Sequence, residues 1–170
     1  MIAYRPEIDG LRAIAVMSVI FGHAGFELFS GGFVGVDIFF VISGYLISSI
    51  VISEVNGGNF SYRNFYERRA RRLLPALLVV LIFSSVPSYF FMLPDELENY
   101  GQSLIATMGF GNNILLWITS GYWELDSEFK PLLHMWSLGV EEQFYLIFPA
   151  IVIAAITKYN GNRAVPIFLL

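Results

Sequence analysis

Long apolar segments, separated by short polar connections, constrain this chain more than any other feature. Four of them cover residues 11–29, 33–52, 73–93 and 135–156, and a weaker one covers residues 102–119. A helix needs about 20 apolar residues to cross the hydrocarbon layer of a bilayer. The chain is also 56% hydrophobic and only 14% charged, which is unlike an ordinary soluble domain. We therefore predict an all-α integral membrane protein with about five transmembrane helices in the lipid bilayer.

Composition also excludes several chemistries. The chain has no cysteine, which removes disulfides, thiolate metal sites and a cysteine acyl-enzyme. Its two histidines are too few for a three-histidine zinc site. The net charge of −4 carries little information because the charges are segregated along the chain. We expect no metal cofactor and no nucleic-acid partner.

The positions of arginine and lysine predict the orientation of the chain, because cytoplasmic connections carry an excess of these residues. Arg5 and Arg12 come before or at the start of the first apolar segment. The second and third segments are separated by five arginines: Arg63, Arg68, Arg69, Arg71 and Arg72. We therefore expect a cytoplasmic N-terminus. Lys158 and Arg163 would lie outside after five crossings, so either segment 102–119 is re-entrant or the rule fails there.

Arg12 and His23 are separated by ten residues that are almost all apolar or small. On an α-helix, eleven positions give three full turns plus about 20°, so both side chains share one face and lie about 16 Å apart along the axis. A histidine inside lipid is costly and is by default a candidate functional residue. The alternative is a structural histidine, satisfied by a neighbouring helix or by the outer interface.

Asp37 lies about five residues into the second apolar segment. It approaches the outer half of the membrane from the other side of the Ser30-Gly31-Gly32 turn, opposite His23. A carboxylate paired with His23 would fix the imidazole tautomer and stabilise its protonated form. The alternative is that Asp37 lies at the interface and caps its own helix.

The sequence FYERRARRLLP contains four arginines in five residues. Basic residues at the cytoplasmic end of a span are expected from topology alone. Guanidinium groups also bind phosphates through forked hydrogen bonds. Arg69 and Arg72 lie one turn apart on one helical face, beside Arg68. A phosphate-bearing cytosolic substrate and anionic lipid head groups are both compatible with this cluster.

The last apolar segment opens with a third polar group. His134, Ser137 and Glu141 are spaced to share one helical face, and Glu142 is offset by about 100°. Two adjacent carboxylates are hard to explain by packing, although they could stabilise a helix N-terminus through its dipole. His134 within reach of a buried carboxylate would form a second acid–base pair.

Other polar residues are assigned structural roles. Asn112 and Asn113 are predicted to form hydrogen bonds between helices. Ser61 is predicted to cap the helix that enters FYERRARRLLP. Asp9 and Arg12, at i and i+3, could pair where the first helix begins.

Four motifs, in this order and spacing, resemble the acyltransferase 3 family of bacterial membrane acyltransferases. They are Arg12-x10-His23, GGFVGVDIFFVISGYLI, FYERRARRLLP and HMWSLGVEEQFYLIFP, and together they cover residues 4–150. The opening YRPEIDGLRAIAV is most similar to the O-antigen and surface-polysaccharide O-acetyltransferases of that family. The resemblance implies transfer of an acetyl group from cytosolic acetyl-CoA to a hydroxyl of a carbohydrate acceptor outside the membrane. It also implies a multi-pass protein of the bacterial inner membrane.

The family pattern implies roles for matching positions. Arg12 and His23 match the essential pair of the first helix, and His23 would act as a general base or carry the acyl group covalently. An arginine at the cytosolic face could hold a CoA phosphate while the thioester arm reaches inward. The predicted catalytic set is His23, Arg12, Asp37, Glu141, Glu142 and His134, and the predicted acetyl-CoA-binding set is Arg69, Arg72 and Arg68.

The length of the chain differs from that of the family, whose members have about twice as many spans. We therefore expect residues 1–170 to be the N-terminal part of the acyltransferase domain, without the C-terminal SGNH-type domain of some members. The chain also stops within an apolar run at residues 168–170, which fits a piece of a longer protein. An inactive truncated remnant is the alternative.

A transporter or proton relay is a second class of function for these residues. Arg12, His23, Asp37 and Glu142 would then line a path for charge. Transporters often contain inverted repeats with paired broken helices, and no internal repeat is found in this sequence. That observation and the arginine cluster favour the enzyme.

Overall fold

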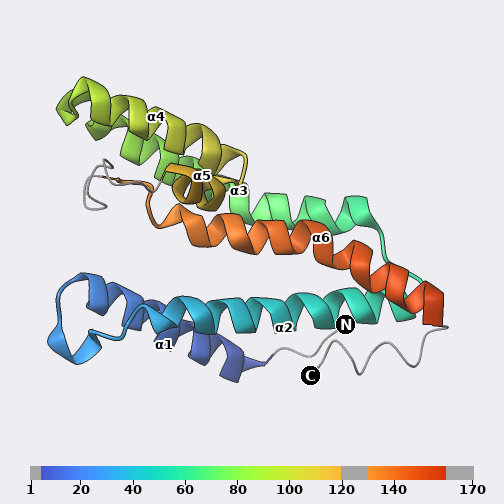
Figure 1. The fold of residues 1–170 in the computed structure, drawn as a ribbon. Helices are drawn as coiled ribbons and strands as arrows, with labels where there is room; N and C mark the ends of the chain where they lie inside the picture. The colour runs from blue at the N-terminus through green and yellow to red at the C-terminus, as the bar shows by residue number, and fades with distance from the viewer. Residues whose placement is uncertain (1–4, 120–129, 160–170) are drawn as a thin grey trace. The chain divides into compact units, whose positions relative to one another are not determined.

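The computed structural model describes residues 5–119 and 130–159, and every element in those residues is helical. In chain order the elements are α1 (Pro6–His23), the 3-10 turn η1 (Glu27–Phe29), α2 (Val34–Asn56), α3 (Tyr62–Phe91), α4 (Pro94–Met108), α5 (Asn112–Thr119) and α6 (Met135–Tyr159) (Figure 1). Ser61 is the N-cap of α3 and its side chain accepts from the backbone N–H of Asn64 at 3.5 Å, as predicted.

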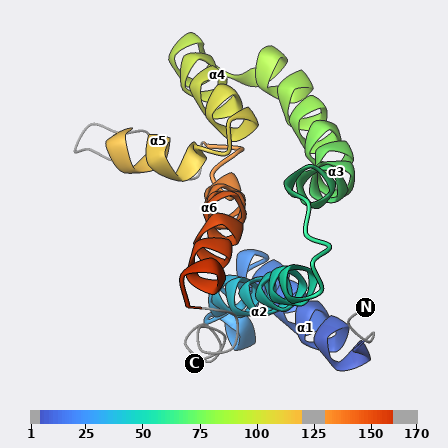
Figure 2. The same cartoon turned by 90° about the vertical axis from the view of Figure 1, so that its right-hand side faces the viewer.

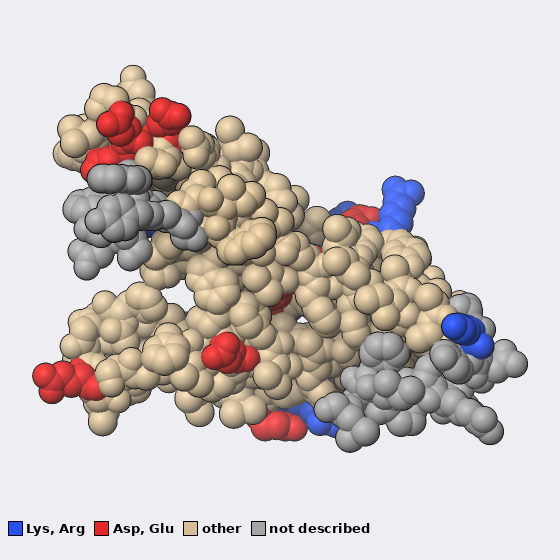
Figure 3. All heavy atoms as spheres, viewed as in Figure 1, with Lys and Arg blue, Asp and Glu red and all other residues tan. Residues whose placement is uncertain are grey.

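Three helices in the described residues are long and apolar enough to cross a membrane: α2, α3 and Met135–Ile156 of α6. Large apolar side chains on α3 point outward, with Phe83 80% exposed and Val79 67% exposed. Such patches are costly in water and expected in lipid. Most of the surface drawn in Figure 3 is uncharged. These features confirm the predicted all-α membrane class.

Two of the five predicted spans are not among these three candidates in the described residues. The 18-residue helix α1 carries Glu7, Asp9 and Arg12, and it is not among the three candidate spans. The weaker segment 102–119 is not one helix, because α4 ends at Met108 and α5 begins at Asn112. Phe110, between them, has a φ of 53°, in the left-handed region that a continuing α-helix excludes. The eight residues of α5 that the structure describes extend about 12 Å along the helix axis.

Contacts divide the chain into two compact units: residues 1–60 with 145–170, and residues 61–144. The helix α6 contributes its residues up to Phe144 to the second unit and those from Tyr145 to the first.

The first unit is built on close packing of α1 against α2, which lie side by side in Figures 1 and 2. A Cβ atom on Gly32 would overlap the carbonyl oxygen of Ser18, and one on Gly35 would overlap that of Ala15. Ala15 is fully buried. The two backbones therefore approach each other as closely as small residues permit, as in many membrane helix pairs.

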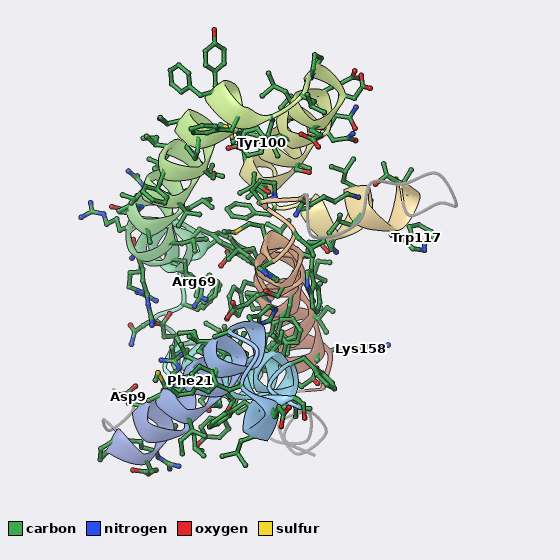
Figure 4. The ribbon with its side chains drawn as sticks, turned by 90° about the vertical axis from the view of Figure 1, so that its left-hand side faces the viewer. Asp9, Phe21, Arg69, Tyr100, Trp117 and Lys158 are labelled. Atoms are coloured by element: carbon green, nitrogen blue, oxygen red, sulfur yellow. The ribbon has the colours of Figure 1, made fainter. Side chains whose placement is uncertain are left out.

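The second unit combines an apolar core with polar side-chain contacts. Its core contains Leu77, Leu81, Tyr100 and Leu132. The hydroxyl group of Tyr100, which lies between α3 and α4 in Figure 4, is hydrogen-bonded to the hydroxyl groups of Ser84 and Ser85 at 2.9 and 2.8 Å. A buried tyrosine hydroxyl needs such a partner, so these contacts fix where α4 lies against α3.

Candidate active site

Arg12 and His23 lie on one continuous helix, α1, so the predicted helical spacing between them applies. The Arg12 guanidinium lies 3.8 Å from the Asp9 carboxylate, which confirms the predicted i, i+3 pair. Nδ1 of His23 lies 2.8 Å from the carbonyl oxygen of Val19. Because a carbonyl can only accept, Nδ1 donates in this contact and Nε2 of the neutral imidazole is the basic nitrogen.

Asp37 lies in the first turn of α2, where the helix dipole stabilises its negative charge. It does not cap the helix with a hydrogen bond, because the N-cap residue is Phe33. Within the described residues, the Asp37 carboxylate makes no hydrogen bond or ion pair. The carbonyl of Val19 contacts the ring nitrogen of His23 that a pairing carboxylate would orient. A functional pairing of Asp37 with His23 therefore stays a prediction.

The arginines of α3 have different surroundings. Nη2 of Arg71 lies 2.6 Å from Oε1 of Glu67, and the Arg71 side chain is 78% exposed. This is an ordinary surface pair one turn apart. Arg68 and Arg72 are exposed, whereas Arg69 is half-buried. Figure 4 shows Arg69 on the side of α3 that faces α6.

Arg69 and Glu142 bring together two groups that the sequence predicted separately. Nη2 of Arg69 lies 3.9 Å from Oε1 of Glu142, and only 22% and 17% of their side chains are exposed. A direct charge-assisted hydrogen bond is about 2.7–2.9 Å long. The two half-buried side chains are therefore paired by charge at a distance longer than a direct hydrogen bond.

The predicted geometry of the other residues before and on α6 needs one correction. His134 is exposed and precedes Met135, the first residue of α6, so the argument from helical spacing does not apply to it. Its carbonyl oxygen accepts a hydrogen bond from the Ser137 hydroxyl at 3.1 Å. Glu141 is half-buried on α6 beside Glu142.

Gln143 belongs to this region and was missed by the sequence analysis. Its Nε2 donates to the carbonyl oxygen of Phe110 and to Oδ1 of Asn113, each at 2.9 Å. Nδ2 of Asn113 donates back to Oε1 of Gln143 at 3.1 Å. Asn112, also buried, donates to the carbonyl oxygen of Leu132 at 2.8 Å. Asn113 thus forms the predicted hydrogen bonds between helices, whereas Asn112 bonds to the turn that precedes α6. The run of three polar residues at 141–143 is the sequence signal that could have identified Gln143.

Comparison with known proteins identifies the family to which this chain belongs. A family model described as an acyltransferase domain matches residues 5–170. The chain belongs to the acyltransferase 3 family. This assignment confirms the resemblance carried by the four motifs.

Relatives within the acyltransferase 3 family are named O-acetyltransferases. The peptidoglycan O-acetyltransferase OatA of Listeria monocytogenes is 41% identical over 152 residues, which cover 88% of this chain and 24% of OatA. YrhL of Bacillus subtilis, provisionally named a peptidoglycan O-acetyltransferase, is 40% identical over 171 residues, which cover 98% of this chain and 27% of YrhL. The chain spans about a quarter of the length of the curated relatives it matches. No solved structure matches it.

In this member of the acyltransferase 3 family, the predicted site residues form one group in each unit. Arg12, His23 and Asp37 belong to the first unit. The second unit contains the arginines of α3 together with His134, Glu141 and Glu142, and there Arg69 meets Glu142.

Proposed function

We propose that this chain is the N-terminal part of a membrane O-acyltransferase that moves an acetyl group from cytosolic acetyl-CoA to a hydroxyl of a cell-surface glycan. Membership of the acyltransferase 3 family supports the reaction class. The observation that carries the site assignment is the placement of Arg12 and His23 on one face of a continuous helix. In this proposal the N-terminus of α1 is cytoplasmic and the protein lies in the bacterial inner membrane.

The proposed reaction uses His23 as the general base. The glycan hydroxyl oxygen attacks the thioester carbonyl carbon while Nε2 of His23 takes the hydroxyl proton. The C–O bond of the new ester forms, the C–S bond breaks, and the departing CoA thiolate takes the proton back. Arg12 lies about 16 Å away along the axis, too far to touch the same atoms. It is therefore assigned to the distant phosphates of the donor.

Arg69, Arg72 and Arg68 are proposed to contact the phosphates of acetyl-CoA as well. Their guanidinium groups match phosphate geometry through forked hydrogen bonds. The half-buried Glu142 beside Arg69 would hold that guanidinium in place before the donor binds. Arg71 is left out because it pairs with Glu67 on the surface.

The acceptor that we propose is peptidoglycan. OatA and YrhL are both named for this glycan. The O-antigen acceptor expected from the opening of the sequence is the other candidate. Incubating membranes that contain the full-length protein with each glycan and radiolabelled acetyl-CoA distinguishes the two, because only the true acceptor gains an alkali-labile acetyl ester.

The His23→Ala variant of the full-length protein tests the catalytic assignment. Loss of a general base lowers a rate by about 10²–10⁴-fold, so we expect acetyl transfer to fall by that factor at an unchanged protein level. His134→Ala provides the comparison, because it removes the other histidine. A larger loss in His134→Ala than in His23→Ala would move the catalytic role to His134.

The donor site is tested by the apparent KM for acetyl-CoA in Arg69→Ala and Arg72→Ala. We expect a rise of roughly tenfold in each, as for the loss of one charged hydrogen bond of about 1.5 kcal/mol. The KM for S-acetylpantetheine, which lacks the nucleotide, should stay unchanged. Arg71→Ala is the matched control. An unchanged KM for acetyl-CoA in both variants would return these arginines to a role in topology.

A further inference from the structure

The junction between α4 and α5 is held by one side chain of α6. The carbonyl of Phe110 cannot join either helix, since α4 ends at Met108 and α5 begins at Asn112. It accepts from Nε2 of Gln143 at 2.9 Å. Phe110 is half-buried, and the Gln143 amide supplies the partner that its carbonyl does not receive from a helix.

The contact of α6 with this junction is close as well as polar. A Cβ atom on Gly139 would lie 2.7 Å from Oδ1 of Asn113 and 3.0 Å from the carbonyl oxygen of Phe110. Gly139 and Gln143 are four residues apart, so they share one face of α6. Asn113 and Gln143 exchange two amide hydrogen bonds across that face, at 2.9 and 3.1 Å. We call Gly139, Gln143, Asn113 and the Phe110 carbonyl the amide clamp.

The amide clamp fixes the rotation of α6 about its own axis. Glu142 precedes Gln143 and points about 100° away from it around the helix. A glutamate carboxylate lies about 6 Å from the helix axis, so a rotation of about 30° would move it by about 3 Å. That movement is comparable with the 3.9 Å that separates Glu142 from Arg69. The Arg69–Glu142 pair therefore depends on the rotation of α6 that the amide clamp sets.

We propose that Gln143 is a positioning residue of the acyltransferase site, which acts by holding Glu142 beside Arg69. Gln143 does not touch the acetyl donor in this proposal. Its two donated hydrogen bonds hold α6 against the α4–α5 junction, and the adjacent carboxylate is directed towards α3 as a result. The inference about geometry stands on the described contacts, whereas its effect on catalysis rests on the proposed function.

Cross-linking tests the geometric part without any enzyme activity. Arg69→Cys and Glu142→Cys are introduced together into the full-length protein, after any cysteine outside these 170 residues has been replaced by serine; the 170 residues have none of their own. A short bifunctional thiol reagent then links the two positions, and mass spectrometry of the joined peptides gives the yield. Because this pair of substitutions removes the ion pair, the yield reports how α3 and α6 are held by their remaining contacts, which include the amide clamp.

Adding Gln143→Leu should lower that yield by about fivefold, as expected when a half-buried hydrogen-bond network is broken. Gln102→Leu is the matched control, because Gln102 is exposed and its amide donates to Glu98 on its own helix. The swapped pair Asn113→Gln with Gln143→Asn conserves the summed side-chain length and should recover part of the yield. A yield that stays at the parent level in Gln143→Leu would overturn the proposal.

Kinetics test the functional part. Gln143→Leu should raise the KM for acetyl-CoA in the same direction as Arg69→Ala and leave the KM for S-acetylpantetheine unchanged. In the double variant Arg69→Ala with Gln143→Leu, no further rise is expected, since both act through one interaction. Additive rises would overturn the positioning role. If the parent transfers no acetyl group while the cross-linking result holds, the clamp stands and the proposed function fails.

Discussion

The two units of this chain pack their helices by different means. In the first, α1 and α2 approach backbone to backbone, with Gly32 against Ser18 and Gly35 against Ala15. In the second, polar side chains make many of the contacts between helices, through Tyr100 and through the amide clamp. Close backbone packing tolerates no added atom, whereas a hydrogen bond between side chains can lengthen or exchange its partner. The first arrangement suits a rigid pair of helices, and the second allows small adjustments between helices.

The polar contacts of the second unit also lie where the backbone departs from helix. Phe110 has a positive φ, and its carbonyl oxygen is bound by Gln143. A non-glycine residue in that region costs of order 1 kcal/mol and persists only when its surroundings hold it. The strain at the α4–α5 junction and the Arg69–Glu142 pair thus share one supporting residue.

The largest effect that separates the two units is expected from Gly35→Ala in the first. The new methyl group would overlap the Ala15 backbone and the Val19 side chain. The overlap with the backbone can be relieved only if the two helices move apart. We expect a loss of stability of about 1–3 kcal/mol, measured as a lower Tm in detergent.

Gly44→Ala is the matched control for that prediction. A Cβ atom at Gly44, also on α2, meets nothing within 4 Å. Alanine is the better helix former by about 0.5–1 kcal/mol, so the Tm should hold or rise slightly. If Gly35→Ala and Gly44→Ala behaved alike, the backbone contact between α1 and α2 would not determine the stability of the first unit.

A smaller effect is expected from Tyr100→Phe in the second unit. The change removes a hydroxyl group that is hydrogen-bonded to Ser84 and Ser85 but leaves the buried ring in place. In the variant each serine hydroxyl can donate to the carbonyl of Leu81, so both keep a partner. We expect a loss of about 0.5–1.5 kcal/mol in the free energy of unfolding. Tyr89→Phe, at a residue that is 71% exposed, should leave the Tm unchanged. Equal shifts in the two variants would mean that this hydrogen bond does not fix α4 against α3.

The smallest effect is expected from Arg71→Ala. The pair with Glu67 is short, at 2.6 Å, but exposed to solvent. Exposed pairs contribute about 0–1 kcal/mol and are screened by salt. We expect a Tm within about 1–2 °C of the parent at low salt and no difference at high salt. A fall as large as that of Tyr100→Phe would show that polar contacts in this unit contribute regardless of burial.

Several features of the fold could be predicted because they depend on neighbouring residues. The apolar segments predict where α2, α3 and α6 cross, and the spacing of Asp9 and Arg12 predicts their pair. Ser61 was predicted as an N-cap from the residues that follow it. Each of these needs only the period of a helix or the chemistry of its first turn.

Other features depend on which helices meet, and helical periodicity does not contain that information. Arg69 and Glu142 were predicted in separate groups, and only the packing of α3 and α6 brings them to 3.9 Å. The break at Phe110 was missed because its residue type gives little signal for a positive φ. Gln143 was missed because a neutral amide beside two carboxylates gives no separate signal in the sequence. Its role becomes visible only with its partners, 30 and 33 residues earlier in the chain.

The glycine contacts of α1 and α2 also have a consequence for the order of assembly. Gly32 and Ser18 are joined only by the short turn around η1, so their contact needs no later part of the chain. Chains emerge N-terminus first, and contacts between near neighbours form sooner than distant ones. The helical hairpin of α1 and α2 can therefore close while the rest is still being synthesised. The hydrogen bond to the Phe110 carbonyl cannot form before Gln143 has been synthesised. The contacts of the second unit are therefore completed only after α6 has been inserted.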